Sequence, residues 1–160
     1  GELAGNSVLR EALASRYRER NQIDVSADEI LITNGVTQAC FSAFMTQIEE
    51  GDEVMVLDPF YPQHNSKIEL LGGKVVTVEL DKNNNFRLDA KALENAVSDA
   101  TKMIVLINPA NPTGTMYTHE ELMEIRAIAI KYDLIVLADE VYEFNIYDTN
   151  ICHYIFNFFY

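Results

Sequence analysis

Short apolar runs alternate with longer amphipathic stretches along this chain of 160 residues, and this alternation most limits how it can fold. The apolar runs, typical of buried strands, are 30–33, 54–57, 75–78, 103–107 and 134–138. The stretches with helical spacing or helix-capping residues are 8–20, 37–50, 62–71, 89–98 and 118–131. Strands separated by helices predict an α/β fold, with a mostly parallel sheet covered on both faces.

The acidic composition narrows the set of partners. The formal net charge is −13, whereas binding to nucleic acid or to an anionic membrane surface needs clustered Lys and Arg. No stretch offers the ~18 unbroken apolar residues of a membrane-spanning helix. Residues 1–5 also lack the basic start and apolar core of a signal peptide. We therefore expect a cytoplasmic protein that binds neither nucleic acid nor membrane.

The few cysteines and histidines give no sign of a disulfide or metal framework. Cys40 and Cys152 are the two cysteines, which fits a reducing compartment. Cys152 and His153, taken together with His64 and His119, match no zinc-binding spacing. The sequence therefore predicts no metal site.

Two polar motifs follow two of the predicted strands. Asn108-Pro-Ala-Asn-Pro-Thr-Gly114 comes after the run 103–107, and Asp139-Glu-Val-Tyr142 comes after the run 134–138. Open α/β sheets bind their ligands at the carboxyl ends of the strands. An Asn, an Asp and a Tyr brought together there can hold a flat heteroaromatic ring by its edge, as an enzyme that binds pyridoxal phosphate must do.

These two motifs and the turn 33–35, in this order, resemble the class I/II aminotransferases, which have the aspartate aminotransferase fold (fold type I). The resemblance covers residues 3–148, and the segments 139–143 and 146–148 look most like the kynurenine aminotransferase and glutamine transaminase K branch. It implies the three-layer α/β/α large domain of that family, present here as an incomplete unit.

The resemblance assigns the cofactor, pyridoxal 5'-phosphate, to specific side chains. Asp139 resembles the aspartate that pairs with the pyridine nitrogen, and Asn111 and Tyr142 resemble the donors to the phenolic oxygen. Taken alone, Asp139 could simply end a strand or cap the next helix, and Asn111 could belong to a rigid Asn-Pro turn without a ligand.

Further cofactor contacts are implied upstream. Gly35, Val36 and Thr37 resemble the phosphate-binding turn, where main-chain N–H groups at a helix N-terminus meet the phosphate. Tyr61 matches the aromatic residue that stacks on the pyridine face. The alternatives are an ordinary strand-to-helix turn and a core aromatic residue beside a proline.

Several family features have no counterpart in the sequence. No lysine follows Lys131, so the lysine to which the family attaches the cofactor is absent and no catalytic residue is assigned. The resemblance thus predicts a chain truncated at both ends, with a partial cofactor-binding domain over 1–148 and a hydrophobic, non-family-like tail over 149–160. The family sheet has the strand order 3-2-4-5-6-7-1, so its last two strands are missing, which leaves a gap of roughly 14 Å between strands five and one.

The function implied by the resemblance is transfer of an amino group between an amino acid and a 2-oxo acid. The family usually forms homodimers, and without the lysine we expect the isolated chain to be inactive. Two alternatives stay open: a pyridoxal-phosphate-dependent lyase, such as a cysteine-conjugate β-lyase, and a non-catalytic binding or regulatory module.

Overall fold

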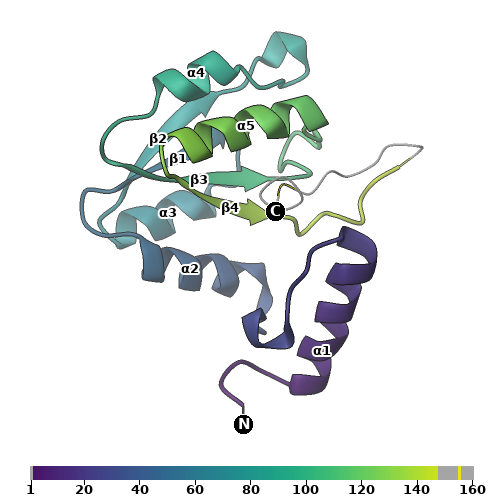
Figure 1. The fold of residues 1–160 in the computed structure, drawn as a ribbon. Coiled ribbons are helices and arrows are strands. Elements are labelled where there is room, and N and C mark those ends of the chain that lie inside the picture. The colour runs from purple at the N-terminus through teal and green to yellow at the C-terminus, as the bar shows by residue number, and fades with distance from the viewer. Residues whose placement is uncertain (1, 148–154, 156–160) are drawn as a thin grey trace.

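The computed structural model describes residues 2–147 and Ile155 (Figure 1). The helices are α1 (Ser7–Arg16), α2 (Gly35–Gln47), α3 (Gln63–Leu70), α4 (Ala90–Asn95) and α5 (His119–Lys131). The strands are β1 (Glu53–Asp58), β2 (Lys74–Glu79), β3 (Thr101–Ile107) and β4 (Ile135–Asp139). A π-helical turn (Tyr17–Asn21) and two 3-10 turns (Ala27–Glu29 and Lys82–Asn84) complete the described elements.

The four strands form one parallel sheet with the order β2-β1-β3-β4. This confirms the α/β class, and the order is the one that the family resemblance implies for these strands. The register pairs Ile107 at the end of β3 with Asp139 at the end of β4. The two polar motifs therefore leave the sheet side by side.

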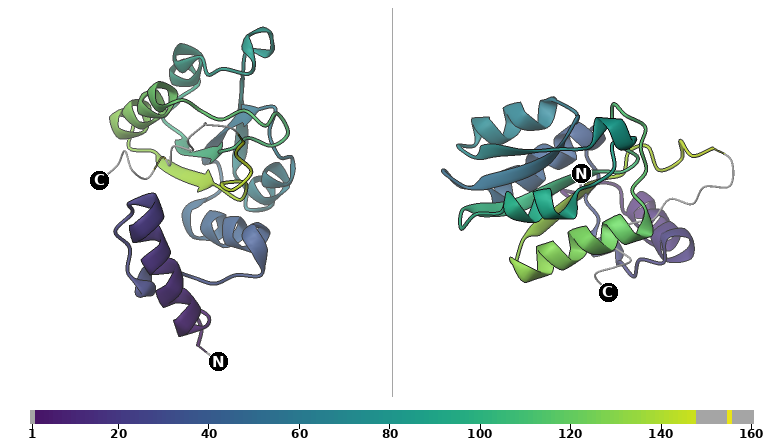
Figure 2. Two further views of the ribbon diagram at one scale, coloured as in Figure 1. Left: turned by 90° about the vertical axis from the view of Figure 1, so that its right-hand side faces the viewer. Right: turned by 90° about the horizontal axis from the view of Figure 1, so that it is seen from above.

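Helices cover both faces of the sheet, α2 and α3 on one and α4 and α5 on the other (Figures 1 and 2). Alternate side chains of β1 point to opposite faces, as the two-residue repeat of a strand requires. Val54 and Val56 pack with Phe44 and Ile68, whereas Met55 and Leu57 belong to the core that includes α5. The result is a three-layer α/β/α sandwich with two separate apolar cores.

The prediction of a strand over residues 30–33 is wrong. The segment is irregular, and none of its residues belongs to the sheet. The N–H of Ile32 donates to the carbonyl of Ala4 at 3.0 Å, and a Cβ on Gly5 would lie 2.5 Å from Cβ of Ile32. The segment therefore pairs with the N-terminal stretch, because the described sheet offers it no neighbouring strand.

Helix ends differ from the predictions by a few residues. Helix α2 begins at Gly35 and ends at Gln47, since Ile48 turns extended and is buried. Gly51 lies in the turn that follows, with a φ of +92°. Helix α4 is shorter than predicted, and the 8–20 helix changes to a π-helical turn after α1. Helix α5 begins with a capping box formed by Thr118 and Glu121.

Helix α1 lies apart from the sheet, beyond the free edge of β4 (Figure 2). An ion pair between Arg16 and Glu143 ties it to the turn that follows β4. Within the described ranges, no helix combines the length and the apolar character needed to cross a bilayer. The tail predicted over 149–160 lies outside the described residues except for Ile155, which is buried in the core beside α5.

Candidate functional site

The ends of β3 and β4 are held together by the backbone. The N–H of Asn108 donates to the carbonyl of Asp139 at 3.0 Å. The side-chain oxygen of Asn108 accepts from the N–H of Tyr117 at 3.2 Å, which folds the following loop back over the strand end. Gly114 closes this loop with a φ of +70°, a conformation that favours glycine. Local sequence thus fixes where Asn111 sits relative to Asp139.

A cavity of about 140 Å³ opens at this edge of the sheet. Its walls are Val36, Thr37, Tyr61, Ile107, Asn111, Asp139, Val141 and Tyr142. Six of the seven residues predicted to contact a cofactor therefore line one cavity. The seventh, Gly35, is the first residue of α2 and precedes Val36 directly. The residues come from the start of α2, the loop after β1, the loop after β3 and the turn after β4.

Asp139 is buried, with 5% of its surface exposed. Its Oδ1 accepts from the N–H of Val141 at 3.3 Å, and its Oδ2 lies 3.4 Å from Nε2 of His64. A carboxylate that is buried in this way is stabilised by a positive partner, either a protonated imidazole or a ligand cation. The position of Asp139 at the cavity wall leaves room for a ligand cation.

His64 is the site residue that sequence reasoning missed. It lies in α3 and is 1% exposed, and its ring meets the rings of Tyr61 and Phe44 edge to face, at 5.6 and 5.9 Å between centroids. The available signal was its place three residues after Tyr61, at the start of a predicted helix, where the N–H of His64 turns back to the carbonyl of Tyr61 at 3.3 Å. Its spacing from the other histidines and from Cys152 matches no zinc-binding pattern, so the sequence assigns His64 no role.

Asn111 and Tyr142 face each other across the cavity. Nδ2 of Asn111 lies 3.5 Å from the hydroxyl oxygen of Tyr142, a long and weak hydrogen bond. Both groups can donate, and neither is buried. The pair is therefore available to donate to an oxygen that enters between them.

The start of α2 has the properties of an anion site. Gly35 adopts a φ of +78°, and a Cβ placed on it would meet nothing within 4 Å. The side chain of the preceding Asn34 makes no capping hydrogen bond, and the first turn carries no acidic residue. The N–H of Gly35 donates to the carbonyl of Thr33 at 2.9 Å. The N–H groups of Val36 and Thr37, together with the positive end of the helix dipole, therefore remain for an anion.

Cys40 lies behind Asp139, on the inner face of α2. The thiol is 4% exposed, and burial raises its pKa to about 11, with the negative charge of Asp139 adding to the rise. The positive charge of Lys67 opposes it. Cys40 is therefore a protonated thiol at neutral pH unless a metal or another positive group binds it.

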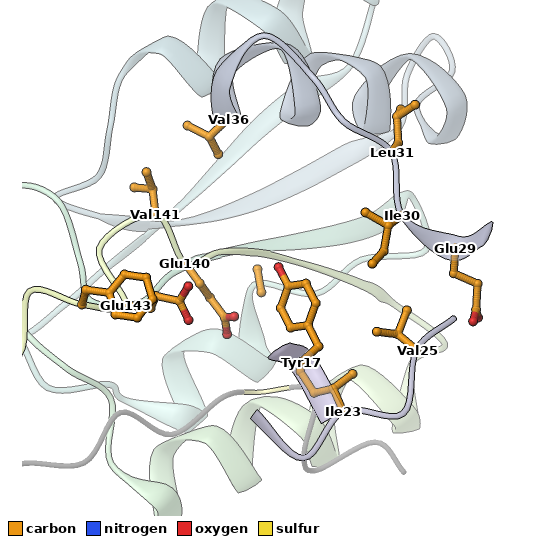
Figure 3. A pocket seen from close by; sticks show the side chains of 12 residues that line it. Tyr17, Ile23, Val25, Glu29, Ile30, Leu31, Val36, Glu140, Val141 and Glu143 are labelled. Carbon is orange, nitrogen blue, oxygen red and sulfur yellow. The ribbon is translucent and has the colours of Figure 1, made fainter. Parts of the chain in front are cut away.

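A second and larger cavity of about 520 Å³ adjoins the first (Figure 3). It lies between the turn after β4 and the segment that follows α1, and both cavities share Val36 and Val141 as wall residues. Most of its lining is apolar, and Figure 3 shows Tyr17, Glu140 and Glu143 gathered on one side of it. This is the region where the family resemblance predicts the gap between strands five and one.

The two acidic groups beside Tyr17 in the larger cavity differ in their partners. Glu143 pairs with Arg16 and accepts a second hydrogen bond, 3.4 Å long, from Nδ2 of Asn21. Glu140 has one buried carboxylate oxygen without a hydrogen-bond partner in the described part of the chain. Burial and the neighbouring Glu143 raise the pKa of Glu140 to about 7. Burial is also the main reason why the pKa of Tyr17 is raised.

The sequence is also similar to those of known aminotransferases. The family model described as aminotransferase class I and II matches residues 1–153. The aspartate/prephenate aminotransferase of Thermus thermophilus is 36% identical over 145 residues, which is 91% of this chain and 38% of that protein. The aspartate aminotransferase of Bacillus subtilis is 32% identical over 139 residues, or 87% of this chain and 35% of that protein.

Solved structures agree with the sequence comparison. An alanine aminotransferase from Pyrococcus furiosus superimposes with a TM-score of 0.93 at 32% identity, covering 97% of this chain and 39% of that one. The chain thus spans a little more than a third of the length of these relatives. The finer resemblance to the kynurenine aminotransferase branch stays a prediction. The chain belongs to the class I and II aminotransferases, a family that depends on pyridoxal phosphate.

Proposed function

We propose that this chain is the cofactor-binding part of an enzyme that uses pyridoxal phosphate to transfer an amino group between an amino acid and a 2-oxo acid. One observation carries the proposal: a buried carboxylate, a pair of donors, an aromatic ring and a helix N-terminus border one cavity. Its volume of about 140 Å³ is close to that of a cavity known to hold a single six-membered ring.

Each wall of the cavity has a role in this proposal. Asp139 would hold the ring nitrogen, Asn111 and Tyr142 would donate to the ring oxygen, and Tyr61 would lie against the ring face. Gly35, Val36 and Thr37 would meet the phosphate through main-chain N–H groups at the start of α2. The absence of a side-chain cap from Asn34, the absence of an acidic residue from the first turn of α2 and the open space beside Gly35 support this assignment.

The burial of Asp139 explains why a carboxylate is suited to the ring nitrogen. In a site removed from water, its negative charge strongly favours a proton on a nitrogen beside it. When bound, pyridoxal phosphate supplies an electron-withdrawing ring that stabilises negative charge at the α-carbon of the substrate. The N–H of Val141 and the imidazole of His64 fix the orientation of the Asp139 carboxylate.

Turnover requires groups that the sequence does not supply. Because no lysine follows Lys131, we propose that the 160-residue chain binds the cofactor without a covalent bond and does not transaminate. A cytoplasmic location, a role in amino-acid biosynthesis and a homodimeric parent enzyme belong to the same proposal. We further propose that residues 1–148 are a partial cofactor-binding domain and that residues 149–160 are a hydrophobic, non-family-like tail.

The test is titration of the full chain with pyridoxal phosphate, followed by the absorbance of the bound cofactor. Asp139→Asn removes the charge but keeps the shape, so we expect the affinity to fall at least about 30-fold, as for loss of one partner of a buried charged pair. Asp99→Asn, at an exposed turn, is the matched control and should bind as the parent does. Failure of the parent chain to bind, or equal binding by Asp139→Asn, would contradict the proposal.

A further inference from the structure

The two outer strands of the described sheet differ in how their edges are protected. The order β2-β1-β3-β4 leaves β2 and β4 each with one edge that no described strand pairs with. Strand β2 begins at Lys74 and ends at Glu79, and both side chains are exposed. Charged residues, lysine above all, keep further strands from pairing with a free edge. Strand β4 has only Ile, Val, Leu and Ala before Asp139, so its edge lacks this protection.

The larger cavity, of about 520 Å³, lies beside this unprotected edge. Ala138 in β4 and Val141 just after it form one wall, and Leu31 belongs to the opposite wall (Figure 3). The side chains of Leu31, Val141 and Phe144 line the cavity although each residue is more than half exposed. Apolar side chains gathered at the surface in this way mark sites of protein interaction. The edge and the cavity thus offer backbone hydrogen bonds and an apolar pocket together.

We propose that the outer edge of β4 and the larger cavity form a docking site for one extended, apolar segment of a partner protein, which adds a strand beside β4 and directs a lysine or arginine at Glu140. Backbone N–H and C=O groups repeat along a free edge with a spacing that another strand matches. Alternate side chains of the added strand would enter the apolar cavity, as the two-residue repeat of a strand requires.

The acidic residues of the cavity wall select a basic residue in the partner. Glu143 is paired with Arg16, and the carboxylate of Glu29 accepts from the N–H of Ser26. The Glu140 carboxylate accepts from the backbone N–H of Ile155, but its Oε1 is buried and has no hydrogen-bond partner in the described ranges. Buried polar atoms are nearly always paired. A lysine or arginine of the docked segment would supply the missing donor as a charge-assisted hydrogen bond.

A second copy of this chain fits the site less well than a single segment does. Each copy has a formal net charge of −13, so two copies repel each other. Helix α1 lies beyond the free edge of β4 (Figure 2), so the sheet of a second copy reaches that edge only by displacing α1. One added strand needs only about 4.8 Å of width. The cavity between β4 and the segment after α1 is already open.

The test measures binding of a fluorescein-labelled peptide to the full chain by fluorescence anisotropy. The peptide has about eight residues, alternating valine and threonine with one central lysine, which is a typical strand length. We expect saturable binding. A peptide with glutamate in place of the lysine should bind at least about 10-fold more weakly, because it meets Glu140 with a like charge. A peptide with proline in place of the threonines cannot donate to β4 and should not bind.

Two variants of the chain locate the site. Leu31→Asp puts a charge into the apolar wall and should lower the affinity for the lysine peptide at least about 10-fold, the contribution of one buried leucine side chain. Leu70→Asp is the matched control, because Leu70 is also exposed but does not line the cavity. Glu140→Gln should remove the preference for the lysine peptide over the glutamate peptide. Far-ultraviolet circular dichroism establishes that each variant is folded.

Amide hydrogen exchange then identifies the strand that is paired. The lysine peptide should slow exchange in β4 and leave β2, the other outer strand, unchanged. No saturable binding, equal binding of the proline peptide, or slowed exchange in β2 instead of β4 would overturn the proposal. So would a dimer in sedimentation whose β4 amides are protected without peptide, which would assign the edge to a second copy. The measurements need no cofactor, so their failure leaves the proposed function standing.

Discussion

The two adjoining cavities differ in what their polar groups are free to do. In the larger one, of about 520 Å³, Glu143 is already paired with Arg16, and most of the wall is apolar. In the smaller one, of about 140 Å³, the carboxylate of Asp139 and the donors of Asn111 and Tyr142 converge from three segments. Volume alone would favour the larger cavity, but specificity comes from a few well-placed polar groups. We therefore propose that the smaller cavity is the ligand site, and that the larger one is a seam between the N-terminal segment and β4.

The largest expected effect on stability comes from the carboxylate of Glu140, which lines the larger cavity. The pKa of Glu140 is about 7 in the folded chain against an ordinary value of 4.5, so the folded state binds the proton more tightly. Stability should therefore fall as the pH rises from about 4.5 to about 7, and the full loss of up to about 3 kcal/mol is present above pH 7.

Glu140→Gln removes that loss. Urea unfolding at pH 8 should show the variant more stable than the parent by up to about 3 kcal/mol, with the gain disappearing near pH 4. Glu69→Gln, at an exposed position, is the control and should change stability little at either pH. An equal gain at pH 4 and pH 8 would mean that Glu140 is not the source.

A second change separates the seam from the ligand site. Arg16→Met breaks the partly buried ion pair with Glu143, in which the side chains are 24% and 14% exposed. Because solvent weakens the pair, we expect a loss of about 2 kcal/mol rather than the 3–5 kcal/mol of a fully buried pair. Urea unfolding measures the loss, and Arg20→Met on the exposed surface is the control.

The affinity of Arg16→Met for pyridoxal phosphate should change less than about twofold. It is measured without denaturant, at a pH where the variant stays folded. A parallel loss of stability and of affinity would show that the two cavities act as one unit, which contradicts the distinction drawn between them.

The smallest expected effect lies inside the ligand site. Tyr142→Phe removes one hydroxyl donor, so the affinity for pyridoxal phosphate should fall about 3- to 10-fold, the value of one hydrogen bond of about 1 kcal/mol. Tyr132→Phe is closely matched, because the two side chains belong to residues that are 37% and 38% exposed. Spectroscopic titration of both variants gives the comparison. Equal affinities would remove Tyr142 from the site.

Sequence reasoning succeeded where local pattern decides the structure. The ends of β3 and β4 follow from buried apolar runs, and their parallel register brings Asn111 and Asp139 to the same edge. It failed for 30–33, whose strand-like pattern finds no pairing partner in the described sheet. The wall behind Asp139 was also missed, because Cys40 and His64 lie on two different helices and no sequence spacing connects them. Their meeting is set by how α2 and α3 pack on the sheet.

The most direct test of the central claim is nitrogen NMR of the full chain with ¹⁵N-labelled pyridoxal phosphate. If Asp139 holds the ring nitrogen, that nitrogen should be protonated at neutral pH and should show the shift of a pyridinium, and Asp139→Asn should lose this signal. A neutral pyridine nitrogen in the parent chain, or the same pyridinium signal in Asp139→Asn, would contradict the account.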